Sequence, residues 1–233
     1  MKIERTRVYN IKDALRGMRN PMNSWHLADT RSKFTTSRSR MPEDYTVIYE
    51  DPDSGICEGI LIGPNDKKLS ESLIRAGSEH RKFLRQIFVS CNITAPMYFW
   101  KQVATYQVGT TSNSTSTMHK LAATPITLDC FETDDFHFEN IKDPITNKVF
   151  IEEYLTALER LRRKYLQTKD MDDWKELVRW LPDSWLQTRT WTGNYEVLRN
   201  MYFQRKNHKL SEWRTFCKWI EKLPCAEDLI LIN

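Results

Sequence analysis

The segment from residue 95 to residue 120 constrains the fold most, because it changes character abruptly at Gly109. Pro96 suits the first turn of a helix, where its missing N–H leaves no hydrogen bond unmade. An apolar stripe at helical spacing follows Pro96, formed by Tyr98, Phe99, Val103, Tyr106 and Val108. The segment therefore predicts a helix that ends at Gly109.

A polar run without formal charge follows this helix. Of the ten residues from Thr110 to His119, eight are Ser, Thr or Asn, and only His119 can become charged near neutral pH. Such a run cannot build a core. It favours either a surface loop, in which these side chains bond their own backbone, or a lining of hydroxyl and amide groups for an oxygen-rich ligand.

The spacing within this segment resembles the central motif of the flavin-dependent thymidylate synthases. In that family an Ala-Pro start leads through Arg-Gln to an Arg-His-Arg triplet, and a serine followed by Gly-Arg-Tyr comes seven residues later. The matching positions here, without a gap, are Ala95-Pro96, Lys101-Gln102, Thr105-Tyr106-Gln107 and Thr115-Ser116-Thr117-Met118.

A second match lies near the C-terminus. The family has Leu-Pro, then Trp-Thr-x-Asn, a further Asn, an Arg, and a His-x-x-x-Glu-x-Arg stretch. This chain has Leu181-Pro182, Trp191-Thr192-Gly193-Asn194, Asn200, Arg205, and His208 with Glu212 and Arg214. The interval between Arg205 and His208 is one residue short of the family's pattern.

The resemblance implies a single α+β domain over residues 1–233, with a small antiparallel sheet packed with long helices. Family members methylate deoxyuridylate (dUMP) with FAD, NADPH and methylenetetrahydrofolate, as homotetramers whose sites lie between subunits. The implied nucleotide-binding positions are Gln102, Thr105, Tyr106, Gln107, Thr115, Ser116, Thr117 and Arg205. The implied cofactor-binding positions are Asn194, Asn200 and His208, with no metal ligand and no assigned catalytic residue.

The chemistry departs from the family at four positions. Thr105, Tyr106, Gln107 and Thr117 stand where the family has Arg, His, Arg and Arg. Losing several charge-assisted bonds to phosphate, at roughly 1.5–3 kcal/mol each, weakens binding by orders of magnitude unless other charges compensate. The base-contacting position keeps its arginine, Arg205.

These departures favour a divergent, phage-type homologue that binds or sequesters a nucleotide, such as a signalling nucleotide, without methyl transfer and without a cofactor. The alternative is an active flavin enzyme that uses FAD to modify a dUMP-like pyrimidine nucleotide. A third class is a structural or DNA-binding protein, although a net charge of +4 is too small to indicate nucleic acid.

Composition agrees with a globular cytoplasmic protein. The 233 residues are 40% hydrophobic, enough for a sizeable core. Five scattered cysteines without Cys-x-x-Cys spacing indicate neither a disulfide framework nor a zinc site. The N-terminus lacks the apolar region of a signal peptide, and no apolar run is long enough to span a bilayer.

Hydrophobic periodicity predicts a mixture of a few strands and several long helices. The expected strands cover residues 3–9, 45–49, 55–62, 88–94 and 187–191. The expected helices cover residues 11–18, 67–88 with a break or a bend at Gly77, 170–180, 195–203 and 212–223, together with a long helix that starts at Asp143-Pro144. Residues 19–44 read as a long loop.

Three further stretches leave alternatives open. The loop 19–44 carries Arg31, Lys33, Arg38 and Arg40, which are either solvated or able to grasp phosphate. The cluster Ser78-Glu79-His80 lies several residues upstream of a Glu-His pair that contributes to the flavin pocket in the resembled family. Residues 131–139 are either an acidic loop or a metal site, and the basic residues 160–164 are either a solvated helix face or a nucleic-acid patch.

Overall fold

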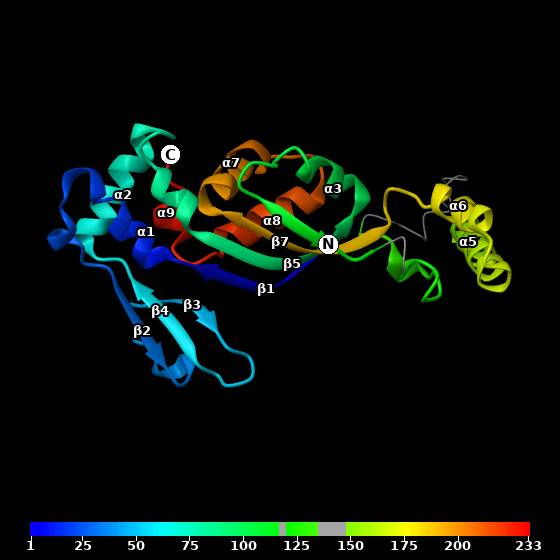
Figure 1. Ribbon diagram of the computed structural model, residues 1–233, viewed down its shortest axis with the longest axis horizontal. Helices are drawn as coiled ribbons and strands as arrows, with labels where there is room; N and C mark the ends of the chain where they lie inside the picture. The colour runs from blue at the N-terminus through cyan, green and yellow to red at the C-terminus, as the bar shows by residue number, and fades with distance from the viewer. Residues whose placement is uncertain (117–119, 135–147) are drawn as a thin grey trace. The chain divides into compact units, whose positions relative to one another are not determined.

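A computed structural model describes residues 1–116, 120–134 and 148–233 of the protein. It contains two sheets and a set of helices, which confirms the predicted α+β class (Figure 1). The described chain forms two compact units. Unit 1 comprises Met1–Lys2, Thr94–Thr105 and Asn113–Arg189, and unit 2 comprises Ile3–Ile93, Tyr106–Ser112 and Thr190–Asn233. The single domain over residues 1–233 stays a prediction.

The larger sheet has the strand order β1-β5-β7-β6. Its strands are β1 (Lys2–Tyr9), β5 (Phe88–Pro96), β7 (Leu186–Asn194) and β6 (Thr111–Ser114). Burial alternates along β5, where Val89, Cys91, Ile93 and Ala95 are inside. The strands expected at residues 3–9, 88–94 and 187–191 are therefore confirmed, whereas the polar run contributes the unexpected strand β6.

The smaller sheet lies in unit 2 and has the order β2-β4-β3 (Figure 1). Strand β3 (Thr46–Glu50) pairs antiparallel with β4 (Cys57–Leu61), as the turn-rich residues between them predicted. The Asp51 carboxylate closes this turn, because it accepts hydrogen bonds from the backbone N–H groups of Asp53 and Ser54.

The prediction of a continuous loop over residues 19–44 is wrong. Strand β2 (Arg31–Thr35) pairs antiparallel with β4, and 3-10 turns cover Asn20–Met22, Trp25–Leu27 and Arg38–Arg40. Strand β2 lies at an edge and is mostly exposed, so it lacks the apolar alternation that identifies a half-buried strand.

Two predicted helices end early. Helix α2 (Pro64–Ala76) stops before Gly77, whose φ of 114° is a conformation that other residues rarely adopt, and the 3-10 turn η4 (Lys82–Gln86) replaces the rest of the helix expected over 67–88. Helix α3 (Met97–Val103) has Pro96 as its N-cap. The chain leaves helical geometry after Ala104, so Tyr106 lies beyond the helix.

The remaining helices lie close to their predicted positions. They are α1 (Ile11–Gly17), α5 (Lys148–Thr168), α6 (Met171–Arg179), α7 (Tyr195–Arg205) and α8 (Ser211–Glu221). The short helix α9 (Ala226–Leu229) was not predicted. The predicted helix start at Asp143-Pro144 lies outside the described residues.

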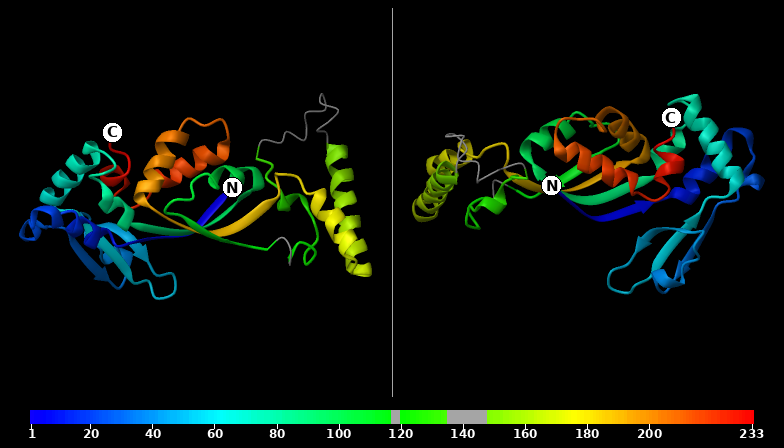
Figure 2. Two further views of the ribbon diagram at one scale, coloured as in Figure 1. Left: turned by 45° about the horizontal axis from the view of Figure 1, so that its top comes forward. Right: turned by 180° about the vertical axis from the view of Figure 1, so that it is seen from behind.

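Each unit has its own core. In unit 2, helices α7 and α8 pack together and bury Tyr195, Trp213 and Phe216. In unit 1, α5 and α6 lie side by side over a cluster that includes Phe131, Leu158 and Leu177 (Figures 1 and 2). On α8 the buried residues recur every three or four positions, which is the pattern of a helix with one apolar face.

The basic segment of α5 departs in part from the predicted solvated face. Arg162 is buried and donates to both carboxylate oxygens of Glu159 at 2.7 Å. Arg163 is exposed and pairs with Glu159 as well, while Lys164 pairs with Asp173 at 2.6 Å. Three of the four basic residues thus pair with carboxylates, which weighs against a nucleic-acid patch.

The smaller sheet is anchored to α2 by a buried ion pair. Arg19 Nε donates to Asp66 Oδ1 at 2.7 Å, with exposed fractions of 4% and 0% for the two side chains. The second oxygen of Asp66 accepts from the backbone N–H groups of Asp29 and Thr30, just before β2. Asp66 therefore ties the start of β2 to the first turn of α2.

We expect Asp66→Asn to lower the free energy of unfolding by about 3–5 kcal/mol, because it leaves Arg19 buried without a counter-charge. Urea unfolding followed by circular dichroism measures the change. Glu71→Gln on the same helix is the control. Its ion pair with Arg75 is largely exposed, so a change within about 0.5 kcal/mol is expected. Equal losses in the two variants would contradict the anchoring role.

Candidate functional site

A polar and aromatic cluster in unit 2 surrounds Arg205, the last residue of α7. Its Nε donates a hydrogen bond of 2.9 Å to the hydroxyl oxygen of Tyr106. Its guanidinium carbon lies 5.0 Å from the centroid of the Trp213 indole and 5.7 Å from the Tyr106 ring. Among the described residues, no carboxylate pairs with Arg205, and its two Nη groups have no hydrogen-bond partner.

Tyr106 holds this arginine in place. The side chain is 8% exposed, and its ring packs edge-to-face against Trp213 at 6.0 Å between centroids. Its hydroxyl accepts from Arg205 and donates to Gln204 Oε1 at 2.8 Å, while Gln204 Nε2 donates to Asn200 Oδ1 at 2.7 Å. One hydroxyl thus connects the segment after α3 to two residues of α7.

His208 lies at the edge of the same cluster. Its Nδ1 accepts from the backbone N–H of Leu210 at 3.2 Å, and its ring is 6.2 Å from that of Trp213. The pKa of His208 is lowered from its ordinary value, first by desolvation and then by the positive charges of Arg205 and Arg214. The imidazole therefore favours its neutral form beside the arginine.

Asn194 has a structural role in this fold. Its side-chain oxygen caps α7 by accepting from the backbone N–H of Val197 at 3.0 Å. Its Nδ2 lies 3.5 Å from the carbonyl oxygen of Gly109. Gly109 has a φ of 77°, and a Cβ there would come within 2.7 Å of that Nδ2, so both conformation and space favour glycine.

The predicted nucleotide-binding residues divide between the units. Gln102, Thr105, Thr115 and Ser116 belong to unit 1, whereas Tyr106, Gln107 and Arg205 belong to unit 2. Thr117 lies outside the described residues.

Several of these residues make hydrogen bonds within the chain or have an exposed side chain. Thr105 Oγ1 donates to the carbonyl of Gln102 at 2.8 Å. The carbonyl of Thr115 accepts from Gln187 Nε2 at 2.9 Å. Gln107 is exposed, and Ser116 and Gln102 are half-buried.

Sequence analysis found Arg205 and Tyr106 but missed their neighbours. Gln204 and Trp213 complete the cluster, and neither stands at a quoted motif position. Trp213 sits among Glu212 and Arg214, two residues that the resemblance did mark, so its aromatic side chain was the available signal. Arginine stacks well on indole, but only the packing of α7 against α8 brings these two side chains together.

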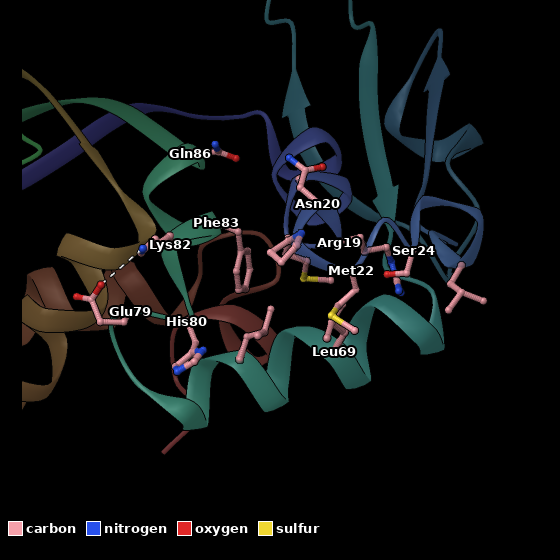
Figure 3. Close-up of a pocket in the computed structure, with 15 residues that line it drawn as sticks. Arg19, Asn20, Met22, Ser24, Leu69, Glu79, His80, Lys82, Phe83 and Gln86 are labelled. Atoms are coloured by element: carbon pink, nitrogen blue, oxygen red, sulfur yellow. Dashed lines mark ion pairs between the residues drawn. The ribbon is translucent and has the colours of Figure 1, made fainter.

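Unit 2 also contains an apolar pocket of about 600 Å³ (Figure 3). Its apolar lining comes from Met18, Met22, Leu27, Leu69, Leu73 and Phe83. Glu79 and His80, which the sequence singled out, also line it, and Glu79 pairs with Lys82 at 3.6 Å. A mainly apolar pocket with a few polar groups suits a small organic ligand.

Other kinds of site have less support. Within residues 1–116, 120–134 and 148–233, no three His, Cys, Asp or Glu side chains gather to hold a metal ion. Part of the stretch 131–139, including His137, lies outside those ranges. No helix in the described part of the chain is long and apolar enough to cross a membrane. The basic residues of the segment 19–44 lie on β2 and in the turn after it; they are Arg31, Lys33, Arg38 and Arg40. Arg38 pairs with Glu50 at 3.6 Å.

Comparison with known proteins identifies the fold. No family model matches the chain, and no curated protein matches it. Two crystal structures of the flavin-dependent thymidylate synthase ThyX from Helicobacter pylori, both with FAD and dUMP, are similar to it. Their TM-scores are 0.62 and 0.60, at 16% and 15% sequence identity, and each match covers 99% of this chain and 98% of the other. The chain therefore has the fold of this synthase over its full length, as the resemblance implied.

We expect Arg205→Gln to raise the pKa of His208 toward 6.5, because the substitution removes a positive charge that opposes protonation. NMR titration of His208 measures the shift. Lys206→Gln is the control, since Lys206 is not among the groups that shift this pKa. An unchanged His208 pKa in Arg205→Gln would contradict the placement of the Arg205 charge beside His208.

The same shift makes folding depend on pH. Because the folded pKa of His208 is below its unfolded value of about 6.5, the unfolded state binds the proton more readily. The contribution of His208 to stability is therefore complete above pH 6.5 and is lost as the pH falls through the folded pKa. Arg205→Gln should reduce this loss, which unfolding curves at several pH values below 7 would measure against the Lys206→Gln control.

Proposed function

We propose that this protein binds a nucleotide, and that it has lost the methyl transfer associated with its fold. Binding alone would allow it to sequester the ligand, for example as a viral protein that removes a signalling nucleotide. The observation that carries the proposal is the Arg205 cluster, in which a guanidinium without a carboxylate partner is positioned by Tyr106 and Trp213.

The construction of this cluster suits recognition of a nucleotide. Neither Nη group of Arg205 has a hydrogen-bond partner among the described residues, so both are available to a ligand. A guanidinium donates bidentately to carbonyl or phosphate oxygens. The hydrogen bond from Nε and the stacking on Trp213 reduce the rotamer freedom that binding would otherwise remove. Arg205 also matches the arginine that contacts the pyrimidine base in the resembled family.

The loss of methyl transfer rests on the neutral central motif. Thr105, Tyr106 and Gln107 leave no cation at the triplet positions, and Tyr106 uses its hydroxyl to hold Arg205. A flavin diphosphate bound without these cations would lack several contacts worth roughly 1.5–3 kcal/mol each.

The residues expected to bind the cofactor use part of their hydrogen-bonding capacity within the chain. Asn194 is 7% exposed, and its side-chain oxygen caps α7. His208 has Nδ1 occupied by Leu210, and the side-chain oxygen of Asn200 accepts from Gln204. We therefore derive no reaction step through a flavin.

The second candidate is an active flavin enzyme that modifies a pyrimidine nucleotide. It is favoured by the full-length fold match to a synthase whose crystal structures contain FAD and dUMP. The pocket lined by Glu79 and His80 adds a site for a small organic molecule. Protein purified without added ligand distinguishes the candidates, because bound flavin has a yellow absorbance and a characteristic mass after denaturation. Colourless protein without flavin mass supports the binding proposal.

We also propose a cytoplasmic homotetramer, by analogy with the resembled family. The support is the shared fold alone. Light scattering during size-exclusion chromatography would measure the mass against the 27.7 kDa of one chain, and a monomer would contradict this part of the proposal.

We expect calorimetry against a panel of mononucleotides, cyclic nucleotides and dUMP to find at least one ligand. Arg205→Gln should raise the Kd of that ligand by at least about tenfold, since a charge-assisted hydrogen bond contributes roughly 1.5–3 kcal/mol. Lys206→Gln, which removes a neighbouring charge that lies over Tyr202 and Phe203, should leave the Kd within about twofold. Absence of binding across the panel, or equal effects of both variants, would contradict the proposal.

A further inference from the structure

A second arginine, in unit 1, has the same construction as Arg205 but stands at no motif position. Arg189 lies on β7, and its guanidinium carbon is 4.4 Å from the centroid of the Trp100 ring. Its Nε donates to Gln187 Oε1 at 3.0 Å. The guanidinium is thus stacked on an indole and held by a neutral oxygen, as Arg205 is.

The groups that hold Arg189 are themselves fixed. Gln187 is 8% exposed, and its Nε2 donates to the carbonyl of Thr115 at 2.9 Å. Trp100 is 1% exposed, and its indole N–H donates to the backbone carbonyl of Gln187 at 3.0 Å. Because both supports are buried and hydrogen-bonded, the position of the guanidinium is largely set before a ligand arrives.

Arg189 lacks the carboxylate partner that three other buried or half-buried arginines have. Arg19 pairs with Asp66, Arg81 with Glu196, and Arg162 with Glu159. No carboxylate in the described part of the chain pairs with Arg189, and its two Nη groups have no partner there.

The charge of Arg189 is also partly removed from water. Burial lowers the pKa of its guanidinium, which nevertheless stays protonated at neutral pH. A partly desolvated charge without a partner is unfavourable, and an anionic ligand would stabilise it.

The polar run lies next to this arginine in the fold. Thr115, within the run, donates its backbone N–H to the carbonyl of Thr188 at 2.9 Å and accepts from Gln187, the residue that holds Arg189. The run supplies neutral hydroxyl donors but no cation. Arg189 is therefore a cation linked through Gln187 to a segment that the neutral motif left without one.

We propose that Arg189 binds the phosphate group of a nucleotide, as a cation of unit 1 that stands in for those missing from the sequence at Thr105 and Thr117. The identity of the anion as a nucleotide phosphate rests on the proposed function. Recognition of an oxyanion by the paired Nη groups rests on the stacking on Trp100 and on the hydrogen bond to Gln187.

Calorimetry on the full chain tests this with three probes: inorganic pyrophosphate, dUMP and deoxyuridine. Arg189→Gln should weaken the binding of pyrophosphate and dUMP at least tenfold and leave deoxyuridine within twofold. Arg189→Lys, which keeps the charge but loses the planar fork, should give a smaller loss. Arg163→Gln is the matched control, because it removes the same charge from an exposed residue of unit 1, and it should change no affinity more than twofold.

The outcomes separate this proposal from the proposed function. Binding of dUMP that Arg189→Gln leaves unchanged overturns the role of Arg189 while nucleotide binding stands. If pyrophosphate binds in a way that depends on Arg189 but no nucleotide binds, the anion site is supported. The identification of the anion as a nucleotide phosphate is then contradicted. A wild-type chain that binds neither pyrophosphate nor dUMP overturns the assignment of Arg189. Thermal unfolding midpoints of all variants exclude loss of folding as the cause.

Discussion

The Arg205 cluster depends on how a single hydroxyl group is used. Tyr106 lies beyond the end of α3, yet its side chain is buried, and its hydroxyl both accepts from Arg205 and donates to Gln204. The cluster therefore needs the chain to leave the helix after Ala104 and to return toward α7. The close approach of Gly109 to Asn194, the residue that caps α7, makes this return possible. The candidate site and the path of the backbone are thus set by the same contacts.

The elements that could be predicted are those whose apolar residues repeat with one period. Helix α8 and strand β5 each bury one regular face, and this pattern is visible without knowledge of their neighbours. Strands β2 and β6 were missed because both are exposed and polar, so pairing with another strand, and not burial, defines them. The end of α2 at Gly77 was only half recognised, since apolar residues continue at helical spacing through the turn η4.

The site was predictable only where the resemblance marked a residue. Arg205 and Tyr106 were found by spacing, but the hydrogen bond between them joins residues that are 99 positions apart. Trp213 and Gln204 carry no motif, and their roles follow from the packing of α7 and α8. Asn194 and His208 were expected to face a cofactor, yet each makes a hydrogen bond to nearby backbone that a helix N-cap or a turn requires.

The two stacked arginines keep positive charge in a chain whose central motif is neutral. Each guanidinium lies beside a buried tryptophan and a neutral oxygen acceptor, and among the described residues no carboxylate pairs with either one. Because buried residues orient each guanidinium, the residues of the central motif are free to change. Arg189 and Arg205 are both arranged in this way, and the residues at the central motif could then become neutral without removing all positive charge from the protein.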